Sequence, residues 1–131
     1  MSQENVEALL GAFAAVQRGD WELAMEPFAP DVELDQSRMP DGGVYHGRDA
    51  LFDFYARWFG AWEELHFQHE RIEDLDDRVL LMMRLTGRGR TTGAHVSVLA
   101  ADIHTFRDGK IVRMVGYPDA REALKALGLD E

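Results

Sequence analysis

Two polar side chains interrupt an apolar strand pattern in the stretch ADIHTFRDGK, residues 101–110. Asp102 and His104 are two positions apart, and residues at that spacing on a β-strand point to the same side. A carboxyl group in an apolar pocket resists ionisation, so Asp102 could donate a hydrogen bond to a developing enolate or act as a general acid. A neighbouring His104 could relay the proton, act as a base, or hold the carboxyl in place.

The same pair also has a structural interpretation. Asp102 and His104 could satisfy one another, or bond to internal water, in a polar patch of the core. Alternation places four apolar residues on the same face of the strand: Val96, Val98, Ala100 and Phe106. The opposite face is also largely apolar, so we expect both faces to be covered. The sequence leaves the catalytic and the structural interpretation open.

Helical spacing of apolar residues predicts the elements that surround this strand. A first helix begins near the N-terminus and ends at Gly19, and DWELAMEPFAP (20–30) forms a short second helix. A third helix with an unusually aromatic stripe covers residues 51–62, and DAREALKALG (119–128) closes the chain as a short helix.

Period-two alternation predicts the strands. They are expected at 31–37, 64–73, 78–87, 95–107 and 110–117, with a tight hairpin turn at RDGK (107–110). Helices followed by a meander of long strands indicate an α+β domain with an antiparallel sheet, rather than a doubly wound parallel sheet. At 131 residues the chain is expected to be a single domain, residues 1–131.

Charge and composition exclude several classes of partner. The formal net charge of −10 repels nucleic acid and anionic membranes, and the sequence has no run of Lys and Arg to offset it. The acidic N-terminus and the lack of any apolar run near ~20 residues argue against a signal peptide and a membrane span. Because the chain also has no cysteine, we expect a cytoplasmic protein.

The order of elements and several motifs resemble the SnoaL-like branch of the nuclear transport factor 2-like superfamily, which also contains ketosteroid isomerase. The motifs are RGDWELAMEPFAPDVELD, GGVYHGRDAL, GRGRTTG and HTFRDGKIVRMVGYPDAREALKALGL. The resemblance implies a curved antiparallel sheet wrapped around the N-terminal helices, forming a cone with an apolar pocket at its open end. It also implies a homodimer, in which the convex face of the sheet commonly packs on the second subunit.

The resemblance also suggests roles for single residues. Asp102 matches the position of the protonated oxyanion-hole aspartate of ketosteroid isomerase. The general base of that enzyme falls on Gln36, which is an amide and cannot abstract a proton. A bulge could turn Asp35 inward as a replacement base, although alternation places Asp35 on the wet face. The tyrosine that completes the isomerase oxyanion hole falls at Ala12, so steroid isomerisation by that mechanism is not expected.

Other residues are candidates for contact with a ligand or a metal ion. Tyr55, Trp58 and Tyr117 could form the aromatic side of a pocket, although aromatic residues at helical spacing are also typical of a core. His66 and His69, three apart on a strand, point to opposite faces and cannot close on one metal ion. No metal and no cofactor are expected.

The sequence therefore predicts a protein that binds a small apolar or aromatic molecule. If it is an enzyme, we expect cofactor-independent proton transfer of the isomerase, cyclase or dehydratase type, with Asp102, His104 and Asp35 as candidate catalytic residues. Gln36, Tyr55, Trp58 and Tyr117 are the candidate ligand-binding residues. The alternative is a ligand-binding or dimeric scaffold protein of the same fold, without catalysis.

Overall fold

The computed structural model describes residues 2–39 and 42–129, in which groups of helices are followed by groups of strands. The elements are α1 (Ser2–Arg18), α2 (Trp21–Met25), β1 (Phe28–Asp35), β2 (Val44–His46), α3 (Arg48–Gly60), β3 (Trp62–Asp74), β4 (Arg78–Gly89), β5 (His95–Arg107), β6 (Lys110–Tyr117) and α4 (Ala120–Ala126). The strands form one sheet in the order β2-β1-β6-β5-β4-β3. The predicted α+β class is confirmed.

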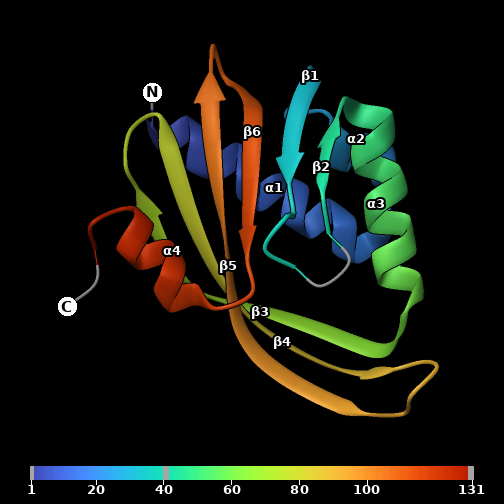
Figure 1. The fold of residues 1–131 in the computed structure, drawn as a ribbon. Helices are drawn as coiled ribbons and strands as arrows, with labels where there is room; N and C mark the ends of the chain where they lie inside the picture. Colours follow the sequence, from blue (N-terminus) through green and yellow to red (C-terminus); the bar gives the residue numbers. More distant parts are fainter. Residues whose placement is uncertain (1, 40–41, 130–131) are drawn as a thin grey trace.

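The sheet is strongly curved. Figure 1 shows the lower halves of β3, β4 and β5 bending beneath α3, while α1 and α2 lie behind the sheet and α4 lies on its other side. The hairpin between β5 and β6 is the predicted tight turn, with Asp108 at φ 53° and Gly109 at φ 78°. Two successive residues with positive φ match the twist of the paired strands. The long strands therefore form a curved support for the helices.

One strand pair departs from the expected antiparallel arrangement. Strand β1 pairs with β6 in parallel, with Leu34 opposite Met114, whereas the other pairs in the sheet are antiparallel. The short strand β2, which the sequence pattern left in a turn-rich segment, pairs with the other edge of β1. Periodicity identifies a strand but not its neighbour, which explains why neither pairing was predicted.

The boundary between α3 and β3 also differs from the prediction. Helix α3 ends at Gly60, and Trp62, expected at the end of the helical stripe, is the first residue of β3. Glu64 has a positive φ of 54°, and the pairing of β3 with β4 shifts register between Glu63 and His66. An irregular strand start of this kind disrupts the alternation on which the prediction depended.

Each face of the sheet carries its own core. On strand β4, Leu81 and Met83 belong to the core beneath the helices, whereas Leu80 and Met82 pack on the opposite face. The opposite face is covered by α4, which contributes Ala120 and Ala123. The chain's own C-terminal helix therefore covers part of the convex face that was expected to contact a second subunit.

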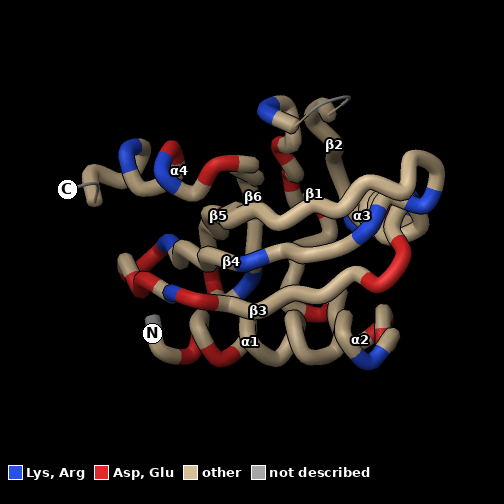
Figure 2. Tube along the Cα trace, turned by 90° about the horizontal axis from the view of Figure 1, so that it is seen from below, with Lys and Arg blue, Asp and Glu red and all other residues tan. Residues whose placement is uncertain are grey.

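Charged residues are dispersed over the surface. Figure 2 shows Lys and Arg scattered among strands and helices and interleaved with Asp and Glu. Several arginines on the strands form ion pairs with carboxylates, including Arg84 with Glu70 and Arg88 with Glu64. Of the helices within the described ranges, none is long and apolar enough to cross a membrane.

Candidate functional site

A cavity of about 130 Å³ lies between the helices and the concave face of the sheet. In the described part of the chain, its lining comes from three helices, from five strands of the sheet and from the segment after β1, and most of it is apolar. The helical contribution consists of Leu9, Ala12, Phe13, Val16, Trp21, Ala24, Met25, Phe54, Tyr55, Trp58 and Phe59. An engineered apolar cavity of roughly 150 Å³ binds benzene, so this space suits at least one ring.

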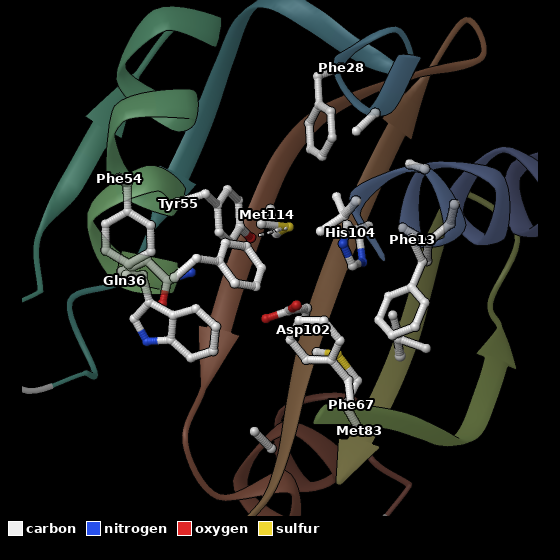
Figure 3. Close-up of a pocket in the computed structure, with 18 of the residues that line it drawn as sticks. Phe13, Phe28, Gln36, Phe54, Tyr55, Phe67, Met83, Asp102, His104 and Met114 are labelled. Atoms are coloured by element: carbon white, nitrogen blue, oxygen red, sulfur yellow. Dashed lines mark hydrogen bonds between the residues drawn. The ribbon is translucent and has the colours of Figure 1, made fainter. Parts of the chain in front are cut away.

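Asp102 extends from the middle of β5 into this cavity (Figure 3). Within the described part of the chain, no hydrogen bond or ion pair to the Asp102 carboxyl is found. Burial raises the pKa of Asp102 from its ordinary value of 3.8 to about 7. The carboxyl can therefore exist in both the protonated and the ionised form near neutral pH.

His104 lies next to Asp102 on the same face of β5 and is only 2% exposed. Its Nδ1 atom is buried, and no described residue forms a hydrogen bond with it. Burial lowers the pKa of His104 to about 4, although the backbone carbonyl of Val79 partly offsets this effect. No hydrogen bond joins His104 to Asp102 in the described structure, which contradicts the interpretation that the pair satisfies itself.

Tyr55 brings a hydroxyl group into the cavity from helix α3 (Figure 3). This hydroxyl donates to the Sδ atom of Met114 across 3.7 Å. Burial raises the pKa of Tyr55 well above its usual range, and the charge of Asp102 adds to this effect. A thioether is a weak acceptor, so an oxygen atom of a ligand would compete successfully for this hydrogen bond. Trp58, one turn further along α3, also lines the cavity.

Gln36 lies immediately after β1 and reaches the cavity, as alternation predicted. It is 3% exposed, and its Oε1 atom is buried without a hydrogen-bond partner among the described residues. Its amide packs over Gly116, the residue paired with Asp102 on the neighbouring strand β6. A Cβ atom at position 116 would lie 2.5 Å from Gln36 Oε1, so an alanine here would force the Gln36 amide to move.

Gly116→Ala is therefore expected to lower the free energy of unfolding by about 1–2 kcal/mol, because the new methyl group displaces the Gln36 amide. In a Gln36→Ala background the same substitution should cost less than about 0.5 kcal/mol, since the obstructing group is gone. Urea denaturation of the wild type, both single variants and the double variant measures this coupling. Equal costs in both backgrounds would contradict the described packing.

Asp35 does not line the cavity. Its carboxyl accepts hydrogen bonds from the backbone N–H and the hydroxyl of Ser37, at 3.0 and 2.6 Å, and from Arg113 at 3.3 Å. The hydrogen bonds from Ser37 are the main reason why the pKa of Asp35 is lowered. The hypothesis that a bulge turns Asp35 inward as a base is therefore wrong: its carboxylate anchors the loop outside the cavity.

Tyr117 also lies outside the cavity, and its prediction as a ligand-binding residue is wrong. Its ring is 7% exposed in the core beneath α4, on the opposite face of the sheet. The Arg38 guanidinium lies 4.6 Å from the centre of the ring. Tyr117 follows Gly116 at the end of β6, and adjacent strand residues point to opposite faces, so alternation along β6 could have placed it correctly.

Several residues of the cavity were not predicted. Phe13 from α1, Phe67 from β3 and Met83 from β4 surround Asp102 in Figure 3. Each lies in a helix or strand that the apolar periodicity of the sequence predicts. Periodicity shows that such a residue faces inward, but it does not show whether the residue packs in the core or lines a cavity. Across the described residues, no three His, Asp or Glu side chains gather as a metal site would require.

Comparison with known proteins supports the fold. The profile of the SnoaL-like domain family matches residues 9–114. TerC, solved in co-crystals with polyporic acid, is 23% identical, with a TM-score of 0.77 over 95% of this chain and 97% of that chain. An NTF2-like protein from Burkholderia thailandensis E264 is 24% identical, with a TM-score of 0.80 over 94% of this chain and 96% of that chain.

A third similar structure is a SnoaL-like protein from Jannaschia sp. CCS1, provisionally assigned as a polyketide cyclase. It is 21% identical, with a TM-score of 0.80 over 99% of this chain and 95% of that chain. At these identities the similarity establishes the fold alone. No protein of curated function matches the chain. The family profile spans most of the sequence, and the chain belongs to the SnoaL-like domain family.

Proposed function

We propose that this protein binds a small apolar or aromatic molecule and transfers a proton to and from its carbon skeleton through Asp102. One observation carries the proposal: the Asp102 carboxyl faces an apolar cavity, without a protein partner among the described residues, and its pKa is raised to about 7. Such a group is costly to bury and is suited to general acid–base catalysis near neutral pH.

The arrangement suggests a route for the proton. The ionised Asp102 carboxylate removes a proton from a carbon next to a ligand carbonyl, and the electron pair of the broken C–H bond moves to the carbonyl oxygen as an enolate. The Tyr55 hydroxyl and the Gln36 amide are available to donate hydrogen bonds to that oxygen. If protonated Asp102 then returns the proton to another carbon of the same molecule, the net reaction is an isomerisation. If the enolate carbon first attacks a second carbonyl carbon of the molecule, the proton goes to the alkoxide oxygen that results, and the net reaction is a ring closure.

His104 is not proposed as a base or as a proton relay. With a pKa near 4, its imidazole is neutral at pH 7 and is a poor base. It also lacks a direct hydrogen bond to Asp102 in the described structure, so a direct relay between the two is not part of the proposal. Because the imidazole is neutral, it offers no positive charge to Asp102, and burial alone sets the raised pKa of the carboxyl.

The proposal can be tested without knowing the natural substrate. The bicyclic ketone 2-tetralone carries acidic C–H bonds between its aromatic ring and its carbonyl, and their exchange in D2O can be followed by proton NMR. We expect the wild type to accelerate this exchange and Asp102→Asn to slow the catalysed rate by about 100-fold, because an amide cannot take the proton.

Asp53→Asn provides the matched control. It makes the same chemical change at an exposed carboxyl of α3 that does not line the cavity. This variant should exchange 2-tetralone at the wild-type rate. If Asp102→Asn catalysed exchange as fast as the wild type, the assignment of Asp102 would be wrong.

A binding role without catalysis is the second candidate, and one observation favours it. The position that the resemblance assigns to a general base holds Gln36, and the neighbouring Asp35 lies outside the cavity. Asp102 is thus the one carboxyl among the described cavity residues, and it would need to serve as both base and acid. Tight binding of aromatic ketones without any exchange would favour this second function.

A further inference from the structure

The cavity that contains Asp102 adjoins a second, larger chamber. This outer chamber has a volume of about 650 Å³. Among the described residues, five line both this chamber and the inner cavity: Met39, Phe54, Trp58, Leu85 and Ala100. Shared side chains on α3, β4 and β5 mean that one elongated ligand could contact both chambers. The outer chamber, like the inner one, is lined mainly by apolar side chains.

Arg57 is the charged exception. Among the described residues that line the outer chamber, it alone carries a formal charge. Its guanidinium lies 5.9 Å from the centre of the Tyr45 ring, which belongs to the same lining. Within the described ranges no carboxylate lies within ion-pair distance of Arg57, whereas Arg84 and Arg88 each have a glutamate partner. Although the chain carries a net charge of −10, the acidic residues of its described part leave this cation without an ion-pair partner.

We propose that the ligand is an elongated apolar or aromatic acid, whose body lies across both chambers and whose carboxylate binds Arg57. This inference rests on the proposed function and adds the ligand's charge and orientation. A guanidinium offers a planar, two-pronged donor that matches a carboxylate. Arg57 is itself exposed at the rim of the outer chamber, so water screens part of its attraction to a carboxylate.

Asp102 and Arg57, the charged groups that line the two chambers, would orient such a ligand. Asp102 in the inner cavity repels an anion, whereas Arg57 in the outer chamber attracts one. The uncharged end of the ligand is therefore directed to Asp102. This is the end at which the proposed proton transfer takes place, so Arg57 would act as a positioning residue for that reaction.

Two probes of the same shape test the inference by binding alone. Biphenyl-4-carboxylate carries the anion, and biphenyl-4-carboxamide is its neutral counterpart. Isothermal titration calorimetry should show the carboxylate binding to the wild type at least ~5-fold more tightly than the carboxamide, as expected for a partly solvated charged hydrogen bond. Arg57→Gln should abolish that preference and leave the Kd of the carboxamide within ~2-fold. Added salt should weaken binding of the carboxylate only.

Arg84→Gln is the matched control because it removes the same charge from a residue that lines neither chamber. It should change neither Kd by more than ~2-fold. A preference that persists in Arg57→Gln, or that is absent in the wild type, would overturn the inference while leaving the proposed reaction standing. Selective binding of the carboxylate without exchange of 2-tetralone would overturn the reaction alone. Failure of both probes to bind the wild type would overturn the inference and count against the binding of apolar molecules.

Discussion

Asp102→Asn should stabilise the folded protein increasingly as the pH rises, by about 3 kcal/mol more at pH 8 than at pH 4.5. The folded pKa of about 7 lies above the ordinary value of 3.8, so the folded state binds the proton more tightly than the unfolded state does. Stability of the wild type is therefore lost as the pH rises from about 4 through 7, and above pH 7 the full cost of about 4 kcal/mol is present. An amide does not titrate and avoids this cost.

Urea denaturation of the wild type and Asp102→Asn at both pH values measures the effect. The difference between the two proteins isolates Asp102, because all other titrating groups contribute to both. Any cost of burying the amide itself is the same at each pH and cancels in the comparison. A difference that does not change between pH 4.5 and pH 8 would show that Asp102 is not a buried acid.

His104→Phe should have the opposite pH dependence. The folded pKa of about 4 lies below the ordinary value of 6.5, so the folded state resists protonation of the imidazole. The stability that depends on a neutral His104 is fully present above pH 6.5 and is lost as the pH falls through 4. The full loss in the free energy of unfolding is about 3 kcal/mol. A phenyl ring cannot be protonated, so the variant should retain more of its stability in acid than the wild type.

The same pair of denaturation experiments at pH 8 and pH 4.5 tests this second prediction. Most of the loss of about 3 kcal/mol should already be present at pH 4.5, where the unfolded histidine is protonated and the folded one is mostly neutral. Any strain from the larger ring is independent of pH and cancels. If wild type and His104→Phe lose stability equally in acid, then His104 is not a buried neutral imidazole.

In the wild type these two effects nearly compensate. Between pH 4.5 and pH 8 the cost of ionising Asp102 grows, while the cost of protonating His104 disappears. The pair should thus contribute little net pH dependence, and each single variant should reveal the contribution of the other residue. The cavity tolerates two poorly satisfied polar groups at a substantial cost in stability, as is common at functional sites.

The sequence predicted the part of the site that depends on strand alternation. The positions of Asp102, His104 and Gln36 followed from period two along β5 and β1, and all three side chains line the cavity. Alternation is reliable there because each face of the sheet is covered by its own core. Tyr55 and Trp58 followed from the aromatic stripe of α3.

The features of the site that the sequence did not predict depend on contacts between segments far apart in the sequence. The parallel pairing of β1 with β6 brings Gln36 over Gly116, and no local pattern encodes that approach. The hydrogen bonds from Ser37 that keep Asp35 outside the cavity arise from the path of the loop. The second chamber depends on the curvature of β3, β4 and β5, which periodicity does not determine.

The most direct test of the central claim is the pKa of the Asp102 carboxyl in the ligand-free protein. Carbon-13 NMR of protein labelled at the aspartate carboxyl carbon gives this value, and the Asp102→Asn variant identifies the resonance. We predict that the Asp102 signal titrates with a midpoint near 7. A midpoint near the ordinary value of 3.8 would show that the carboxyl is well solvated or paired, and would contradict its proposed role as the acid–base group of the cavity.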